Sequence, residues 1–382
     1  MNVLTDLFAS AVQLYPGQMF PVLYIFYFSS LIPLRMAISL QCEPAEQSES
    51  GKALKGHIFK SKRVQDPYEC RMFCYSELTC QSYNYVKTGK LCELNNRTKE
   101  ARPEDFVRDE TRFYVRRWKN RVSLGSVPEM PAESCGEIKA SEQGMSVSGR
   151  YWLEPQKTKM KSKNFLVYCD MVSKDGAWTL LARFSNSDTK NWMDDSGDWW
   201  YDSAQGAGKT ADPSYSADMI SPAFWLVSGR ELKITRNDDS GHTPLLQTTG
   251  NCLSGKTFRS KITSYGDFRN GSVWSNGECL GKCKVKYGGQ YLTTEGFGQA
   301  SCSGDLQGAD EVGFWCNEGW SGSVIMIGGG GTGCSGADHG IGTTVAKLAS
   351  FKIKEDNRRE FDFSNDVWGS ITKSYSLNLW IR

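Results

Sequence analysis

Hydrophobic positions recur along this chain in short runs, and the runs predict strands more often than helices. Residues 81–86 alternate between polar and apolar side chains, as a half-buried strand does. Two stretches favour helices: the sequence from Asp66 has a capping Asp, then Pro, then Glu in the third helical position, and 222–226 is a short apolar run. Further strands are predicted at 90–94, 112–118, 165–168, 178–182, 231–234 and 377–381. The pattern predicts an α+β protein built from short elements.

The longest apolar run lies near the N-terminus. Met19–Leu34 contains 16 residues without a charge, which is long for a signal-peptide core and short for a membrane span. Ala37-Ile38-Ser39 follows it as a small-residue cleavage pattern. We therefore predict a signal peptide over residues 1–39 and a secreted protein. A retained anchor, with the domains outside the cell, is the alternative.

Composition places the chain in an oxidising compartment. Its 382 residues carry a net charge of +2, so no global charge indicates nucleic-acid binding. Thirteen cysteines against three histidines favour disulfides over zinc sites, and disulfides persist outside the cytosol. The sequons at Asn96 and Asn270 predict glycosylation of a secreted chain.

Residues 42–118 form a cysteine-dense N-terminal module. The predicted helix after Asp66 brings Cys70 and Cys74 to one face, with Cys80 just beyond it. The helix, the Ser-Tyr-Asn-Tyr strand and the Cys-Glu-Leu strand resemble a PAN or apple domain, a small module in which a helix covers an antiparallel sheet. That resemblance implies the bridges Cys70–Cys92 and Cys74–Cys80. Cys42 is then odd: it is free, lost with the signal peptide, or joined to another chain in a disulfide-linked oligomer.

Basic residues gather where this module ends, at Arg112, Arg116, Arg117, Lys119 and Arg121. Alternate strand positions would put several of them on one face, as a weak site for sulfated glycans or acidic matrix. A solvated edge strand is the favoured alternative, because charges on an edge strand prevent aggregation.

After a linker predicted at 119–134, a second domain spans 135–382. Its opening matches fibrinogen-like domains in order and spacing, in the motifs Cys135-Gly136-Glu137-Ile138, Gly149-Arg150-Tyr151-Trp152, Tyr168-Cys169-Asp170-Met171 and Ala177-Trp178-Thr179-Leu180-Leu181. The resemblance implies a larger, irregular domain and a Cys135–Cys169 bridge. The spacing leaves 15 pairings open for Cys252, Cys279, Cys283, Cys302, Cys316 and Cys334.

A glycine-rich stretch at 301–342 carries the candidate chemistry. Its three cysteines would staple a loop that is dense in carboxylates and carbonyls, which are ligands that calcium prefers. Cys316-Asn317-Glu318, Ile327 to Gly331, Cys334 and Asp338 resemble the sugar-site segment of the intelectins, which are calcium-dependent lectins with a fibrinogen-like domain. An irregular surface loop is the alternative.

The intelectin resemblance implies particular calcium and sugar ligands. Gly-Asp-Trp at 197–199 resembles a structural calcium segment, so the implied ligands are Asp195, Gly197, Asp198 and Asp338. Asn317 and Glu318 are the predicted sugar-site calcium ligands, with Trp320 and His339 as further sugar contacts. The pattern departs from the family at 319–322, where Gly-Trp-Ser-Gly replaces the expected His and Cys. A solvated acidic turn and a core Trp320 are the alternatives.

Catalysis is not expected, because no Gly-x-Ser-x-Gly elbow occurs and the tetraglycine lacks the Lys-Ser/Thr of a phosphate loop. The sequence therefore predicts a secreted calcium-dependent carbohydrate-binding protein, whose partners are glycans or extracellular matrix proteins. It resembles secreted invertebrate lectin and matrix proteins. The alternative is a structural or adhesive matrix component, including one of mineralised matrix, that binds without catalysis.

Overall fold

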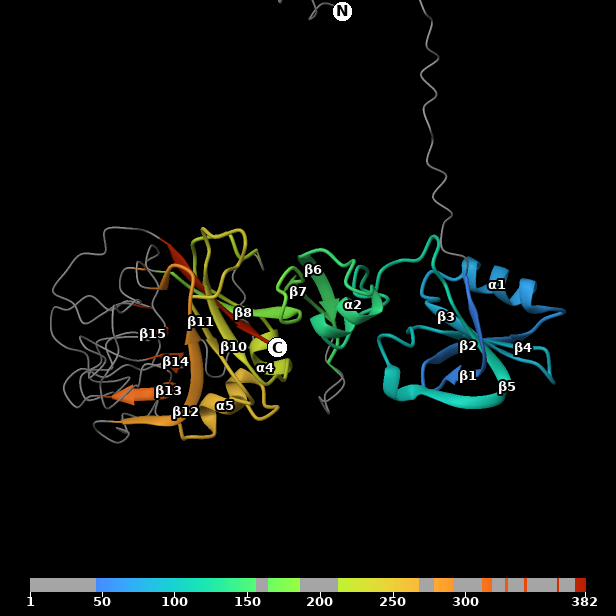
Figure 1. Ribbon diagram of the computed structural model, residues 1–382. Helices are drawn as coiled ribbons and strands as arrows, with labels where there is room; N and C mark the ends of the chain where they lie inside the picture. Colours follow the sequence, from blue (N-terminus) through green and yellow to red (C-terminus); the bar gives the residue numbers. More distant parts are fainter. Residues whose placement is uncertain are drawn as a thin grey trace, which may run out of the picture. The chain divides into compact units, whose positions relative to one another are not determined.

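The computed structural model (Figure 1) divides the chain into two units, residues 1–45 and 46–382. It describes residues 46–155, 164–185, 212–267, 278–291, 294, 311–317, 327–328, 340–341, 363 and 375–382. The predicted signal peptide and Cys42 lie outside these residues. No helix among the described residues is long and apolar enough to span a membrane.

The second unit, residues 46–382, contains two domains. Its N-terminal domain is a five-stranded antiparallel sheet with one helix, α1 (Pro67–Ser76), packed against it. The strands lie in the order β1-β5-β3-β4-β2. They are β1 (Ser48–Leu54), β2 (Ile58–Arg63), β3 (Ser82–Val86), β4 (Leu91–Asn95) and β5 (Phe106–Arg116), and a short 3₁₀ helix, η1 (Pro103–Asp105), precedes β5. The strands predicted at 81–86 and 90–94 correspond to β3 and β4.

Helix α1 begins where the sequence predicts. The Asp66 side chain accepts a hydrogen bond from the Glu69 amide at 2.8 Å, and Pro67 occupies the first turn, where its missing N–H costs nothing. Cys70 and Cys74 are the buried residues of the helix. They bond to Cys92 and Cys80, the two partners that the PAN resemblance implies.

The C-terminal domain is built on a large, mainly antiparallel sheet, in the order β15-β14-β13-β12-β11-β10-β16-β8-β7-β6, with β9 paired to β8. Three short helices are described in this domain: α2 (Cys135–Ser141), α4 (Ala223–Leu226) and α5 (Phe258–Thr263). The strands are β6 (Gly149–Leu153), β7 (Phe165–Asp170), β8 (Trp178–Ser185), β9 (Met219–Ile220), β10 (Leu232–Arg236), β11 (Leu246–Thr248), β12 (Glu278–Tyr287), β13 (Glu311–Asn317), β14 (Ile327–Gly328), β15 (Gly340–Ile341) and β16 (Ser376–Ile381).

The centre of this sheet is buried on both faces. Every residue of β8 and of β16 is buried, and β16 pairs with β8 on one side and β10 on the other. Short apolar runs, Leu180–Ala182 in β8 and Leu379–Ile381 in β16, made these two strands recognisable in the sequence, although buried polar residues flank both runs. The same domain contains the Cys135–Cys169 bridge that the fibrinogen resemblance implies.

Residues 119–134, predicted as a linker, are packed onto the C-terminal domain. Leu124, Met130 and Ala132 are almost fully buried in its main core. The Ala132 amide donates to the Trp152 carbonyl at 3.0 Å, and Ala132 forms a parallel bridge to Leu153 of β6. The segment has the Gly and Pro content of a linker, but its apolar residues gain more by burial than by remaining in water.

Candidate binding surfaces

The residues predicted to bind calcium or sugar lie almost entirely outside the described part of the chain. Of that set, only the backbone of Asn317 is described, as the last residue of β13. The others are Asp195, Gly197, Asp198, Glu318, Trp320, Asp338 and His339. Within the described residues, no group of three or more His, Cys, Asp or Glu side chains could hold a metal ion. The predicted ligand set stays a prediction.

The backbone around these positions forms adjoining strands. Gly313 of β13 pairs with Gly328 of β14, which pairs with Gly340 of β15. Asn317 lies four residues beyond Gly313, roughly 13 Å along the strand. Asn317 and Gly340 therefore do not face each other across the sheet, and the contributions of the two predicted segments need separate variants.

Disulfides also hold this end of the sheet. Cys252 is bonded to Cys283 of β12, and Cys279 of the same strand also forms a disulfide. Four cysteines then remain to be paired, which allow three arrangements instead of 15. They are Cys279, Cys302, Cys316 and Cys334.

A buried ion pair anchors the opposite part of the sheet. The Lys233 Nζ lies 2.5 Å from the Asp170 carboxylate, and both side chains have no exposed surface. The ammonium also lies 5.1 Å from the ring centres of Trp178 and Trp380. Burial alone would raise the pKa of Asp170, but Lys233 outweighs it and the pKa lies below its ordinary value.

The basic cluster at the end of the N-terminal domain is not a solvated edge. Strand β5, which carries Arg112 and Arg116, is flanked by β1 and β3 and is internal. Arg116 and Arg117 are only 3% and 5% exposed. The prediction of a charged edge strand is therefore wrong. The prediction of a binding site that uses the whole basic cluster is also wrong, because the guanidinium groups of Arg116 and Arg117 are buried and held by internal partners.

Arg112, Arg116 and Arg121 have specific internal partners, whereas Lys119 is exposed. Arg112 binds Glu93 at 2.9 Å and Asp109 at 2.8 Å, while Arg121 binds Glu142 at 2.5 Å. Arg116 donates to the Ser141 carbonyl of α2 at 2.6 Å. Glu93 comes from β4, and Ser141 and Glu142 come from the end of α2, so a local sequence pattern could not indicate them; only Asp109 lies on β5 itself.

A second set of ion pairs converges on Glu137, in the first turn of α2. Arg97 and Arg102 both donate to its carboxylate, at 2.7 and 2.9 Å, and Arg102 also binds Glu133 at 2.6 Å. Glu137 is 7% exposed. Since Arg97 and Arg102 belong to the N-terminal domain, these bonds tie it to the start of the C-terminal domain.

The predicted glycosylation sites differ in what can be described. Asn270 lies outside the described residues. Asn96 is partly buried, and its Oδ1 atom is buried without a hydrogen-bond partner in the structure. Thr98, the third residue of the same sequon, is fully buried and accepts a bond from the Ala101 amide. Glycosylation at Asn96 remains a prediction.

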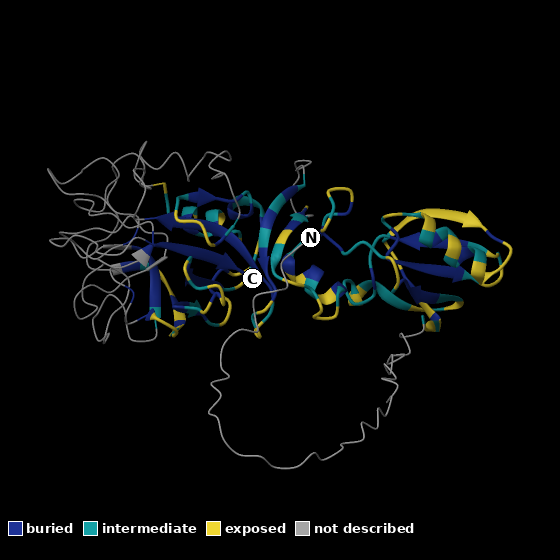
Figure 2. Cartoon of the chain, turned by 90° about the horizontal axis from the view of Figure 1, so that it is seen from above, coloured by how far each residue is buried: buried dark blue, intermediate teal, exposed yellow. Residues whose placement is uncertain are grey.

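Apolar side chains reach solvent on the outer part of the N-terminal domain. Every residue of β2, at the edge of the sheet, is exposed (yellow strand in Figure 2). Tyr68 and Met72 on α1 are exposed as well. Ile58, Phe59 and Leu78 are also exposed, and Lys60 and Lys62 flank the ring of Phe73. We call β2, α1 and Leu78 the outer patch. Clustered exposed apolar residues of this kind are typical of interaction surfaces.

The chain matches solved structures of fibrinogen-like domains. They include the fibrinogen-like globe domain of human ANGPTL2, with 14% identity over 66% of this chain and 99% of that chain and a TM-score of 0.30. The fibrinogen-like globe domain of human ANGPTL6 has 15% identity over 66% of this chain and 95% of that chain, with a TM-score of 0.28. No curated protein matches the chain.

Family profiles match both domains. The profile of the PAN domain matches residues 42–117, and that of the C-terminal globular domain of fibrinogen beta and gamma chains matches residues 132–322. The second match covers half of the chain. The chain belongs to the fibrinogen C-terminal domain family, with a PAN domain before it. The PAN and fibrinogen-like resemblance is thereby confirmed, but the narrower resemblance to intelectins is not.

The two families restrict what the chain does. Fibrinogen-like and PAN domains are non-catalytic binding folds, they are typically extracellular, and they mediate interactions with proteins or glycans. The bridges found in both domains agree with an oxidising compartment. The domains fit an extracellular recognition or adhesive protein.

Proposed function

We propose that this protein is a secreted recognition protein whose fibrinogen-like domain binds carbohydrate with the help of calcium. The observation that carries the proposal is the joining of two disulfide-bridged binding modules in one chain. The intelectin-like motifs around the glycine run add the oxygen ligands that calcium prefers. Fold alone does not define a ligand, so the two modules carry the recognition role, and the motifs supply the choice of calcium and carbohydrate.

Calcium is expected to raise the melting temperature of the purified chain. An ion that binds only the folded state stabilises it by mass action, by about 2.7 kcal/mol at a concentration of 100 times Kd. Asp198→Ala and Asp338→Ala should each remove most of the shift, because each deletes a proposed calcium ligand. Differential scanning calorimetry with and without chelator measures it.

Glu154→Ala is the matched control for the calcium experiment. Glu154 is an exposed carboxylate just after β6, and no side-chain interaction of it is found among the described residues. It should keep the full calcium response. If Asp198→Ala and Asp338→Ala also kept it, the proposed ion site would be in the wrong place.

Glu318→Gln is expected to abolish retention on a glycan array while leaving the melting temperature in chelator unchanged. The substitution removes one charged oxygen ligand and keeps the side-chain shape, so it should affect the ion and sugar more than the fold. His339→Ala, measured separately, tests the second segment. Array binding with calcium and with chelator is the measurement.

The adhesive function is the second candidate, and the outer patch favours it. Its exposed Tyr68 and Met72, beside the lysines of β2, suit contact with another protein more than with a small sugar. Calcium-independent binding to matrix proteins, lost in a Tyr68→Ser/Met72→Ser variant and combined with no glycan retention, would support this function over the lectin.

A further inference from the structure

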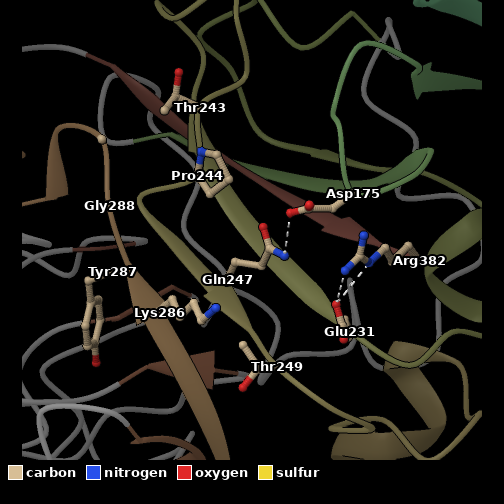
Figure 3. A pocket seen from close by; sticks show the side chains of 11 residues that line it. Asp175, Glu231, Thr243, Pro244, Gln247, Thr249, Lys286, Tyr287, Gly288 and Arg382 are labelled. Carbon is tan, nitrogen blue, oxygen red and sulfur yellow. Dashed lines mark hydrogen bonds and ion pairs between the residues drawn. The ribbon is translucent and has the colours of Figure 1, made fainter.

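A polar pocket opens on the fibrinogen-like domain (Figure 3). None of the residues predicted to bind calcium or sugar lines it. Its volume is about 420 Å³, within the range of small-molecule sites. Asp175 lines it from the turn before β8, and Lys286 lines it from β12. Gln247 lies on β11, and Thr249 follows the end of that strand. The ion-paired Glu231 and Arg382 lie just before β10 and just after β16.

A row of side chains on directly paired strands leads from the core to the floor of the pocket, which Gln247 and Lys286 line. Trp380 of β16 pairs with Lys233 of β10, which pairs with Gln247 of β11, which pairs with Lys286 of β12. Directly paired residues project from the same face of a sheet. Trp380 and Lys233 are fully buried, whereas Gln247 is half-buried and Lys286 is exposed. The row therefore runs from the core into the pocket, and its buried half fixes the backbone beneath the open half.

Donors and acceptors face each other across this floor. The Asp175 carboxylate accepts a hydrogen bond from the Gln247 amide at 3.4 Å (Figure 3), a long bond that a ligand hydroxyl can replace or share. Lys286 makes no side-chain interaction with any described residue. The pocket thus presents a carboxylate acceptor opposite amide and ammonium donors, with the Thr249 side chain beside them.

Charge decides which ligand fits this arrangement. The carboxylates of Asp175 and Glu231 balance the cations of Lys286 and Arg382, so the lining has no net charge. Arg382 already binds Glu231 through two nitrogens, at 2.9 and 2.6 Å. A polyanion would be repelled by the two carboxylates, and a bare cation by the two cationic side chains. A neutral ligand rich in hydroxyl groups would find both donors and acceptors.

From this geometry we propose a second, calcium-independent saccharide site in this pocket, which takes a neutral sugar with adjacent hydroxyl groups. The site extends the proposed carbohydrate recognition and rests on it for the ligand class. It needs no metal ion, because its acceptor and donors are side chains of the sheet and of one turn.

The test is to titrate the full chain with neutral methyl glycosides of glucose, galactose, mannose and N-acetylglucosamine in excess EDTA. EDTA removes calcium from the proposed calcium-dependent sugar site, so any sugar binding that remains is attributed to this pocket. Calorimetry or saturation-transfer NMR should detect at least one of these sugars. Asp175→Asn and Lys286→Gln should each weaken its binding by about tenfold or more, as expected for loss of a hydrogen bond to a charged group.

Lys284→Gln is the matched control, because Lys284 lies two residues away on β12, is exposed, and is bound to Glu311 instead of lining the pocket. It should bind sugar as the wild type does. Sugar binding that occurs only with calcium would overturn this site and leave the proposed function standing. Binding in EDTA that Asp175→Asn and Lys286→Gln leave unchanged, or binding of sulfated sugars alone, would overturn it as well.

Discussion

Asp170→Asn is expected to destabilise the fibrinogen-like domain by about 3–5 kcal/mol. The substitution keeps the shape of the side chain but leaves the fully buried Lys233 ammonium without its counter-charge. Trp178 and Trp380, whose rings lie beside that ammonium, cannot replace a carboxylate. Urea unfolding followed by tryptophan fluorescence measures the loss.

Two further variants separate the missing charge from other effects. Asp170→Asn combined with Lys233→Met removes both charges and should recover much of the stability, because the unpaired ammonium is what costs most. Glu231→Gln breaks the partly exposed pair with Arg382 and should cost about 1 kcal/mol or less. An Asp170→Asn loss as small as that of Glu231→Gln would mean that the buried ammonium is accommodated in some other way.

The same pair predicts how stability depends on pH. Because the folded-state pKa of Asp170 lies below the ordinary value, its contribution is fully present above about pH 4 and is lost as the pH falls through the folded-state value. The difference in stability between the wild type and Asp170→Asn should therefore be constant near neutrality and should narrow in acid.

Local sequence signals predicted the elements that depend on local chemistry. Asp66 and Pro67 mark the start of α1, and the apolar runs mark β8 and β16, because capping and two-sided burial leave traces within a few residues. Lys233 shows the limit. In its strand it reads as a solvent-facing lysine between apolar neighbours, and its partner Asp170 lies 63 residues away.

The candidate surfaces were less predictable than the fold. The outer patch and the polar pocket are assembled from separate strands and turns, and neither has a continuous motif. Strand β12, which contributes Lys286, alternates exposed and buried residues from Lys282 to Lys286, and a shift of register around Gly281 interrupts its pairing. Gly281 has a φ of 74°, and a Cβ there would meet the Tyr265 ring, so tertiary packing sets that irregularity.

Arg117 is the residue whose predicted role changed most. The sequence suggested a solvated cation, but its guanidinium is buried at the end of α1 and donates to backbone carbonyls. Nη1 bonds to the Cys74 and Glu77 carbonyls at 2.9 and 2.8 Å, and Nη2 bonds to the Asn120 carbonyl at 2.6 Å. Carbonyls in the last turn of a helix lack some of their intrahelical partners, and Arg117 adds charged hydrogen bonds to two carbonyls that the Glu77 and Cys80 amides also reach, at 3.2 and 3.3 Å.

Arg117→Ala is therefore expected to destabilise the PAN domain by about 1.5–3 kcal/mol, the usual net contribution of hydrogen bonds to a charged group, because the Cys74 and Glu77 carbonyls keep their bonds from the Glu77 and Cys80 amides. Arg117→Lys should recover only part of the loss, because an ammonium lacks the planar fork that reaches several carbonyls at once. Hydrogen exchange of the α1 amides, together with urea unfolding, measures both variants. Arg108→Ala is the control, since Arg108 lies on β5, is 80% exposed and, among the described residues, pairs only with the exposed Glu110; it should leave exchange unchanged. Equal exchange in Arg117→Ala and Arg108→Ala would show that α1 is held by its two disulfides alone, and that the buried guanidinium is not needed to close its C-terminus.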